Sequence, residues 1–397
     1  MCSTATVFTN SRDRQLTRSL LKADFNLSMH LPDDRLCPPV PVRWNYIHWI
    51  QEILDSTSDT FTDRCNLKRE VTGLDIGVGA SCIYPLLACS TRPLWRMFGT
   101  DIDAHSLAYA KANVANNSLD DRVRLRLTSV EDPLVLLEKM GVECLDFVMT
   151  NPPFYSSEED MKASYGSKLA PPSAICTGAE NEMICHGGDV GFATRILDES
   201  LVLRAKVQWY TVMLGKLSSL QQIVVKLKEA GIKNFAVTAL RAGYRTRRWA
   251  VGWSFGDFRP RNDVARHGEL VQAVLPPVTA QTIKADGKGA VELGRLVDEA
   301  VKTLDVRWKW RENLQEGVMM AKENVWSRAA RRKKKFQRQA EDEGKMEESD
   351  EDEERMALAV KIACKKEYVV LRWLRGEDHV VFESFSGFLK RAVTDKR

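Results

Sequence analysis

The sequence predicts a Rossmann-like α/β fold in which seven strands form one doubly wound sheet. Two observations support this prediction. Short apolar segments of strand length alternate with longer amphipathic segments from residue 71 to residue 240. A glycine turn at residues 77–81 joins the first strand to the first helix, which lets the backbone approach a ligand closely at that point.

Each strand and helix of the sheet follows from this pattern. Strands are expected at residues 71–76, 98–102, 123–127, 145–150 and 207–214, followed by a hairpin of 235–240 and 249–255. Helices are expected at residues 82–88, 103–116, 192–206 and 219–230. The alternation favours a parallel sheet that a hairpin closes.

The C-terminal part of the chain has a different pattern. Residues 269–275 and 379–383 are expected to be strands and residues 307–338 to be largely helical, which predicts a small α+β module. Inside it, a basic run at 328–335 precedes residues 341–354, of which ten are acidic. Such a segment cannot bury a core, so we expect it to be disordered.

The predicted organisation therefore has four parts. They are an N-terminal helical module at residues 1–65, a sheet domain at 66–258, a split accessory α+β module at 259–327 and 356–397, and a disordered insertion at 328–355. A length of 397 residues with 44% hydrophobic residues is sufficient for one large core and a second, smaller one.

Composition limits the environment and the partners. The net charge is only +4, but the charge is segregated along the chain, which predicts local basic surfaces for an acidic partner. The nine cysteines include no Cys-x-x-Cys pair and no zinc-like spacing, so we expect reduced, intracellular thiols and no metal. No window approaches the roughly 18 apolar residues of a membrane span, so we expect a soluble protein.

The glycine turn begins a predicted cofactor site. Its pattern, Asp75-x-Gly77-x-Gly79, differs from the dinucleotide fingerprint and suits an adenosine with a methionine tail, which predicts S-adenosyl-L-methionine as the cofactor. Asp75 is expected to orient the turn or to meet the cofactor's ammonium group. Ser81 is expected to donate to the cofactor's carboxylate.

Two more carboxylates extend this site. Asp101 lies 24 residues after Gly77, at the end of the second strand, where it can accept hydrogen bonds from both ribose hydroxyls. Asp132 follows the third strand and is expected to bind the adenine amino group. The alternative for Asp101 and Asp103 is that they cap the next helix, as aspartate commonly does.

The candidate catalytic turn is Asn151, Pro152, Pro153 and Phe154, at the end of the fourth strand. Successive prolines fix a rigid turn, in which the Asn151 side chain and the Pro152 carbonyl can accept from one planar amine. Phe154 can stack on the ring that carries the amine. The turn predicts methylation of an exocyclic nitrogen through positioning. Adenine N6, guanine N2, cytosine N4 and the glutamine amide all fit, and the alternative is a loop that only ends a strand.

Longer sequence motifs reduce the number of possible methyl acceptors. Residues 43–49 (RWNYIHW) and 75–87 (DIGVGASCIYPLL), with the Asn-Pro-Pro-Phe turn, resemble the U6 small nuclear RNA adenine-N6 methyltransferase family, whose bacterial relatives methylate large-subunit ribosomal RNA. The resemblance covers about residues 20–256 and implies a class I methyltransferase fold followed by a split accessory RNA-binding domain. It also implies cofactor contacts from Arg43, Gly77, Ser81, Asp101 and Asn151.

RNA contacts are implied at two places. The resemblance implies contacts from Lys216 and from residues 245–249, where Arg245, Arg247, Arg248 and Trp249 mix phosphate-binding charge with a stackable ring. Lys168, in the loop after Phe154, is a further candidate. The alternative is a solvated basic hairpin. A paired base cannot reach the catalytic turn, so the target adenosine should be unpaired or flipped out.

The leading hypothesis is thus N6-adenosine methylation of U6 small nuclear RNA or of another structured RNA. Ribosomal RNA is the nearest alternative substrate. Glutamine methylation on a protein and a non-catalytic RNA-binding role are further alternatives. The basic run at 328–335 resembles a nuclear import signal, so we expect a nuclear protein, with the cytoplasm as a second location.

Overall fold

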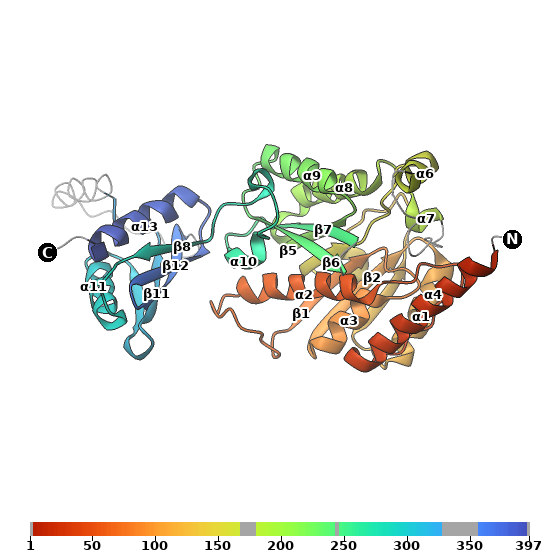
Figure 1. Cartoon of the computed structure of the whole chain (residues 1–397), viewed down its shortest axis with the longest axis horizontal. Coiled ribbons are helices and arrows are strands. Elements are labelled where there is room, and N and C mark those ends of the chain that lie inside the picture. The colour runs from red at the N-terminus through yellow and green to blue at the C-terminus, as the bar shows by residue number, and fades with distance from the viewer. Residues whose placement is uncertain (1–2, 167–179, 243–245, 328–355, 395–397) are drawn as a thin grey trace. The chain divides into compact units, whose positions relative to one another are not determined.

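The computed structural model describes residues 3–166, 180–242, 246–327 and 356–394 of the chain (Figure 1). These residues form two compact units. The first comprises Met1–Asp55, Arg64–Gly256 and Val264–Pro276, and the second comprises Ser56–Asp63, Asp257–Asp263 and Pro277–Arg397. The predicted disordered insertion at 328–355 lies outside the described residues.

The first unit is built on a seven-stranded sheet. Its strands are β1 (Val71–Ile76), β2 (Trp95–Asp101), β3 (Val123–Leu127), β4 (Leu145–Thr150), β5 (Val207–Leu214), β6 (Phe235–Ala242) and β7 (Thr246–Trp253). The order is β3-β2-β1-β4-β5-β7-β6, and only the pairs that include β7 are antiparallel. The predicted Rossmann-like fold is confirmed. These strands are parallel, and the order in which they follow along the chain reverses between β1 and β4. In sheets of this kind ligands bind at the carboxyl ends of the strands at such a point.

Helices cover both faces of this sheet. One apolar core contains residues of α1 (Ser3–Phe25), α2 (Val40–Ser56), α3 (Ile83–Thr91) and α4 (Ala104–Asn116), and the other contains residues of α5 (Leu137–Met140), α8 (Gly188–Leu203) and α9 (Leu217–Glu229). Figure 1 shows α8 and α9 on the side of the sheet opposite to α2 and α3. The connections contain α6 (Glu158–Gly166), α7 (Glu180–Met183), η1 (Arg204–Lys206), α10 (Asn262–Ala265) and η2 (Gln272–Val274).

The N-terminal helices are part of the first unit and not a separate module of residues 1–65. Leu21 of α1 and Tyr46, Ile47 and Ile53 of α2 are completely buried in the same core as α3 and α4. The spacing of these apolar residues in α2 gives the helix an apolar stripe, which is stable only when it packs on the sheet.

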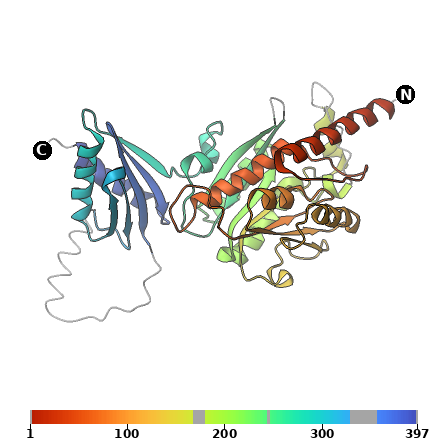
Figure 2. The same cartoon turned by 90° about the horizontal axis from the view of Figure 1, so that it is seen from below.

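The second unit is a five-stranded antiparallel sheet with two helices. Its strands are β8 (Ala280–Lys284), β9 (Arg307–Arg311), β10 (Glu316–Ala321), β11 (Leu358–Lys365) and β12 (Tyr368–Arg375), in the order β8-β12-β11-β10-β9. Figure 2 shows α11 (Ala290–Lys302) and α13 (His379–Thr394) on the same face of this sheet, where they share one apolar core with it. The short η3 (Glu312–Leu314) joins β9 to β10. The predicted α+β class of the module is confirmed.

Three local predictions in this part of the chain are wrong. Residues 269–275 contain the 3-10 turn η2 and belong to the first unit, and residues 379–383 begin the helix α13. Residues 307–321 form β9 and β10 where a helix was expected. In β9 the exposed cations and the half-buried Trp308 and Trp310 alternate with a period of two, which is the pattern of a strand.

Candidate active site

The glycine turn follows β1 directly. The backbone N–H groups of Gly77 and Val78 both donate to the carbonyl of Thr100 at 2.9 Å, which ties the turn to the end of β2. Gly77 has φ of +74° and Gly79 of +62°, a left-handed conformation that glycine adopts without strain. A side chain at Gly77 would meet no described atom within 4 Å, so the turn leaves open space for a ligand.

Asp101 is hydrogen bonded to the backbone of the site. One carboxylate oxygen accepts from Gly79 N–H at 2.8 Å and the other from Asp103 N–H at 2.9 Å. Burial raises the pKa of Asp101 despite these two bonds. The helix cap is Asp103, whose side chain accepts from the N–H groups of His105 and Ser106. Each carboxylate oxygen of Asp101 retains a second lone pair that can accept from a ligand hydroxyl.

Asp75 is fully buried, and neither of its carboxylate oxygens has a hydrogen-bond partner among the described residues. Burial raises its pKa well above the ordinary value, the charge of Asp101 raises it further, and the guanidinium of Arg43 opposes the shift. A buried carboxylate without a partner costs several kcal/mol. The position therefore fits a ligand that brings a donor or a positive charge.

Arg43, in α2, lies close enough to Asp75 for its charge to affect the pKa of that carboxyl group. Its guanidinium is buried and donates to the hydroxyl of Tyr84 at 2.6 Å, while its Nε has no partner among the described residues. Ser81 is also buried, and its hydroxyl accepts from Ile83 N–H at 3.4 Å. Arg43, Asp75, Ser81 and Asp101 thus surround the glycine turn with polar groups that retain unused hydrogen-bonding capacity.

The candidate catalytic turn begins at the strand end next to that of Asp75. The hydroxyl of Thr150, the last residue of β4, donates to the carbonyl of Ile76 at 2.8 Å, so β4 and β1 end together. The next residue is Asn151, whose side-chain oxygen is buried and has no partner among the described residues. Buried acceptors are normally satisfied, so Asn151 Oδ1 is an acceptor for which the described residues supply no donor.

Gly215 and Arg248 lie close to the ring of Phe154. A side chain at Gly215 would come within 3.1 Å of its ring, and the Arg248 guanidinium lies 4.9 Å from its ring centroid. Gly215 is fixed in turn by Asp189, which accepts from its N–H at 2.7 Å and from the Ser219 hydroxyl at 2.9 Å. The structure thus brings the predicted RNA residue Arg248 to the predicted catalytic residue Phe154. Asp189 gave no signal in the sequence beyond its place after two glycines.

A short parallel bridge between Tyr155 and Ile184 lies next to the Asn-Pro-Pro-Phe turn. Tyr155 N–H donates to the carbonyl of Met183 at 3.1 Å, and Cys185 N–H donates to the carbonyl of Tyr155 at 3.0 Å. The Cys185 thiol lies 3.6 Å from the carbonyl of Pro153. Sequence reasoning did not find this support, because residues 183–185 carry no motif.

Asp132 was predicted to bind adenine, but in the structure its carboxylate binds Lys139 and Ser129. It forms an ion pair with Lys139 and accepts from Ser129 N–H at 3.0 Å, and these bonds lower its pKa. Its carbonyl accepts from Arg195. Contact between Asp132 and adenine stays a prediction that requires this ion pair to open or to share an oxygen.

The predicted RNA-binding residues fall into three groups. Lys216, at the carboxyl end of β5, forms an ion pair with Asp160 of α6 at 3.4 Å. Arg247 is exposed on β7, next to Arg248, and Trp249 is half-buried against the second core. Lys168 and Arg245 lie outside the residues that the structure describes.

Over the described ranges, no helix is long and apolar enough to cross a membrane. Nor does this part of the chain bring three or more histidine, cysteine, aspartate or glutamate side chains into a group that could hold a metal ion.

The seven-stranded order, the glycine turn after β1 and the Asn-Pro-Pro-Phe turn after β4 define a Rossmann-like methyltransferase. Residues 7–257 match the model of a family described as RNA methyltransferase, and this chain belongs to that family. The predicted enzyme class and the resemblance are therefore confirmed.

Individual relatives agree with this result. A U6 small nuclear RNA (adenine-(43)-N(6))-methyltransferase of Schizosaccharomyces pombe is 36% identical over 97% of this chain and 94% of the relative. The RNA N(6)-adenosine-methyltransferase METTL16 of mouse is 39% identical over 62% of this chain, but the match spans only 43% of that relative.

A solved structure is also similar. The human METTL16 catalytic domain in complex with a MAT2A 3′UTR hairpin has a TM-score of 0.55 and 36% identity, covering 62% of this chain and 82% of the solved one. The N-terminal domain of human METTL16 in complex with SAH has a TM-score of 0.50 and 33% identity, covering 62% and 83%.

Proposed function

We propose that this chain is an S-adenosyl-L-methionine-dependent methyltransferase that modifies adenine N6 in U6 small nuclear RNA. The observation that carries the proposal is the buried side-chain oxygen of Asn151 at the end of β4, which has no partner among the described residues and lies next to the strand end of Asp75. The similarity to the fission yeast U6 enzyme over nearly the whole of both chains supports the choice of substrate.

The cofactor residues are assigned by their unused capacity. Asp75 would receive the positive end of the methionine moiety, Asp101 the ribose hydroxyls, and Arg43 and Ser81 the cofactor carboxylate. Gly77 and Gly79 leave the space in which this ligand lies. When bound, S-adenosyl-L-methionine supplies an electrophilic methyl group.

The chain's own contribution to the reaction is positioning. Asn151 Oδ1 and the Pro152 carbonyl accept the two N–H bonds of the adenine amine, which directs its lone pair toward the methyl group. Pro153 keeps the turn rigid, and Phe154 stacks on the base. Attack on the methyl group breaks its bond to sulfur and leaves the nitrogen cationic and acidic, so that it loses one proton to water. Because the two acceptors are preorganised, no strong general base is required.

Delivery of the RNA is assigned to the cations around the turn. Arg248 borders it and Lys216 follows Gly215, which packs on Phe154, whereas Arg247, Lys168, Arg245 and Trp249 remain predicted contacts. The base must be unpaired to reach Asn151, so the substrate is a structured RNA with an exposed adenosine. A nuclear location follows from this substrate and from the basic run at 328–335.

The test is methyl transfer to purified RNA by the full chain. Transfer of a labelled methyl group to a U6 transcript is expected, with the product identified as N6-methyladenosine. Asn151→Ala should reduce the rate by at least about a hundredfold, the usual effect of removing one preorganised group. The matched control, Asn116→Ala, removes an exposed amide on α4 and should leave the rate unchanged.

Any of three results would contradict the proposed function. Preferential methylation of ribosomal RNA would favour that substrate, and methylation of a protein glutamine would move the enzyme to another substrate class. Full activity of Asn151→Ala would remove the assigned role of the turn.

A further inference from the structure

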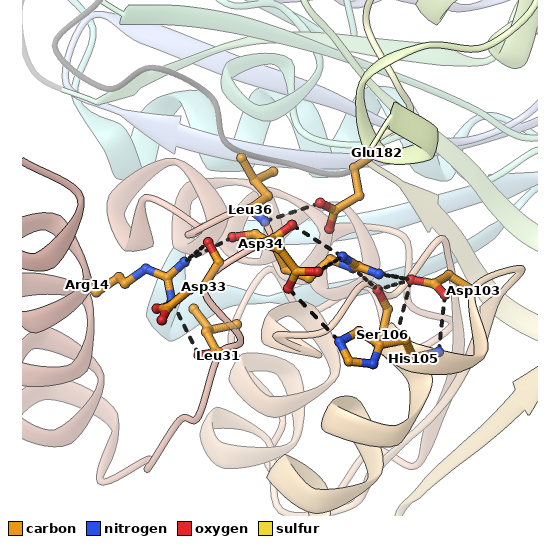
Figure 3. A network of polar contacts seen from close by, with 10 residues as sticks. Arg14, Leu31, Asp33, Asp34, Leu36, Asp103, His105, Ser106 and Glu182 are labelled. Atoms are coloured by element: carbon orange, nitrogen blue, oxygen red, sulfur yellow. Dashed lines mark hydrogen bonds and ion pairs between the residues drawn. The ribbon is translucent and has the colours of Figure 1, made fainter. Parts of the chain in front are cut away.

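A segment between α1 and α2 packs beside the cofactor residues. Figure 3 shows the polar network of this strap, residues 31–37. Arg35 lies at its centre: Nη2 donates to Asp103 Oδ2 at 2.7 Å, and Nε donates to the same oxygen at 3.2 Å and to the Ser106 hydroxyl at 2.9 Å. The Arg35 side chain is only 11% exposed, so water screens these bonds weakly.

The partner of Arg35 is joined directly to the predicted ribose-binding residue. The backbone N–H of Asp103 donates to one oxygen of Asp101, whose other oxygen accepts from Gly79. Asp103 therefore binds the strap through its side chain and the cofactor residue through its backbone. A shift of Asp103 moves the carboxylate of Asp101.

The other side of the strap is joined to α7. Leu36 N–H donates to Glu182 Oε2 at 3.2 Å, and Figure 3 shows Glu182 reaching from α7 to this residue. Glu182 also faces the glycine turn, because a side chain at Gly79 would lie 3.8 Å from its Oε1. The residue after Glu182 is Met183, whose carbonyl accepts from Tyr155 next to the catalytic turn.

These contacts form a continuous path from Asp101 through Asp103, Arg35, Leu36 and Glu182 to Tyr155. We propose that Arg35 and Glu182 are positioning residues that couple the ribose-binding carboxylate to the catalytic turn. The inference rests on the proposed function, since it gives the two ends of the path their roles. Neither residue touches the reacting atoms.

The strap does not need Glu182 to stay folded. Arg14 of α1 donates to the carbonyls of Leu31 and Asp33 at 3.3 and 2.9 Å, and Asn113 of α4 exchanges hydrogen bonds with the backbone of His30 at 2.8 and 2.9 Å. Loss of the Glu182 carboxylate should therefore leave the fold intact, while the distance between the strap and α7 becomes free to vary.

Asp34 provides a matched control. It forms an ion pair with the same Arg35 at 2.6 Å, but its side chain is 66% exposed and its contacts lead away from α7 and the catalytic turn. Asp34→Ala and Glu182→Ala each remove one carboxylate that binds a residue of the strap. Only the second variant interrupts the path.

The experiment measures S-adenosylhomocysteine affinity by calorimetry and the single-turnover rate at saturating cofactor, both on the full chain. Glu182→Ala should weaken binding about tenfold, as for one charge-assisted hydrogen bond, and should also lower the saturated rate. Glu182→Gln, which keeps an acceptor for Leu36, should recover most of both. Asp34→Ala should change neither.

An unchanged affinity and rate in Glu182→Ala, or equal losses in Asp34→Ala, would overturn the coupling. A change in affinity without a change in rate would show that Glu182 affects only cofactor binding, which would also overturn the coupling. If Glu182→Ala does not fold, Arg35→Lys keeps the charge but loses the second bond to Asp103 and carries the same test. Failure of the unaltered chain to bind S-adenosylhomocysteine would instead contradict the proposed function.

Discussion

Two buried aspartates of the first unit have opposite surroundings. Asp55, in α2, receives two hydrogen bonds from the guanidinium of Arg92, at 3.2 and 2.6 Å, and both side chains are less than 10% exposed. Asp75, at the end of β1, is fully buried and has no hydrogen-bond partner among the described residues. The same residue type at similar burial is satisfied by the chain in one place and left unsatisfied in the other.

The contrast between Asp55 and Asp75 distinguishes a carboxylate that stabilises the fold from one that is available to bind a ligand. A buried ion pair that the chain completes stabilises the fold only as long as both partners are present. A buried carboxylate that the chain leaves incomplete destabilises the protein until a ligand supplies the missing donor or charge. The position of each aspartate in the fold explains the difference. Asp75 precedes the glycine turn, where a ligand can bind, whereas Asp55 belongs to the helix α2.

The largest expected effect concerns Arg92. Arg92→Ala leaves the charge of Asp55 buried without a partner and should lower the free energy of unfolding by about 3–5 kcal/mol. Denaturant unfolding followed by fluorescence measures this change. Arg96→Ala, an exposed cation on β2, is the control and should stay within about 0.5 kcal/mol. If the folded fraction of Arg92→Ala also lost cofactor affinity, the proposed separation of roles would be wrong.

The next effect concerns Asp75. Asp75→Asn replaces a buried carboxyl group that has no hydrogen-bond partner among the described residues by a neutral amide of nearly the same shape, so the chain without cofactor should become more stable or remain unchanged. The affinity for S-adenosylhomocysteine should fall about a hundredfold, because the charged acceptor is lost. Thermal unfolding and calorimetry on the same sample give both values. A loss of stability without loss of affinity would make Asp75 a structural residue like Asp55.

The pH dependence tests the same aspartate without ligand. Burial raises its pKa, so the folded chain binds the proton more tightly than the unfolded chain, whose ordinary value is 3.8. The stability from this group is fully present below that value and is lost as the pH rises through the folded pKa. The unfolding temperature of the unaltered chain should therefore fall relative to that of Asp75→Asn as the pH rises. Parallel profiles would contradict the raised pKa.

The candidate site residues could be singled out from the sequence, but the residues that support them could not. Asp75 and Gly77 belong to a glycine turn, Asn151 precedes two prolines and Asp101 ends a strand, so local pattern was sufficient to single these residues out. Their positions at neighbouring strand ends then followed from the α/β class. The residue roles themselves remain predictions that the variants above test.

The supports could not be predicted because they depend on tertiary contacts. Arg35 is 68 positions from Asp103, and Leu36 is 146 positions from Glu182. Asp189 supports Phe154 only through Gly215, which comes from another strand end. In the second unit, alternation in β9 was missed because a strongly charged strand has no apolar run to mark it.

The smallest expected effect concerns an exposed pair. Lys216 and Asp160 lie 3.4 Å apart, with 50% and 33% of their side chains exposed, so their pairing contributes about 0–1 kcal/mol to stability. Lys216→Ala should therefore leave unfolding unchanged, weaken RNA binding several-fold and reduce the salt dependence of binding by about one phosphate contact. Lys206→Ala, at the opposite end of β5, is the matched control. Equal effects of the two substitutions on the salt dependence would show that RNA follows the net charge of the chain rather than the carboxyl ends of the strands.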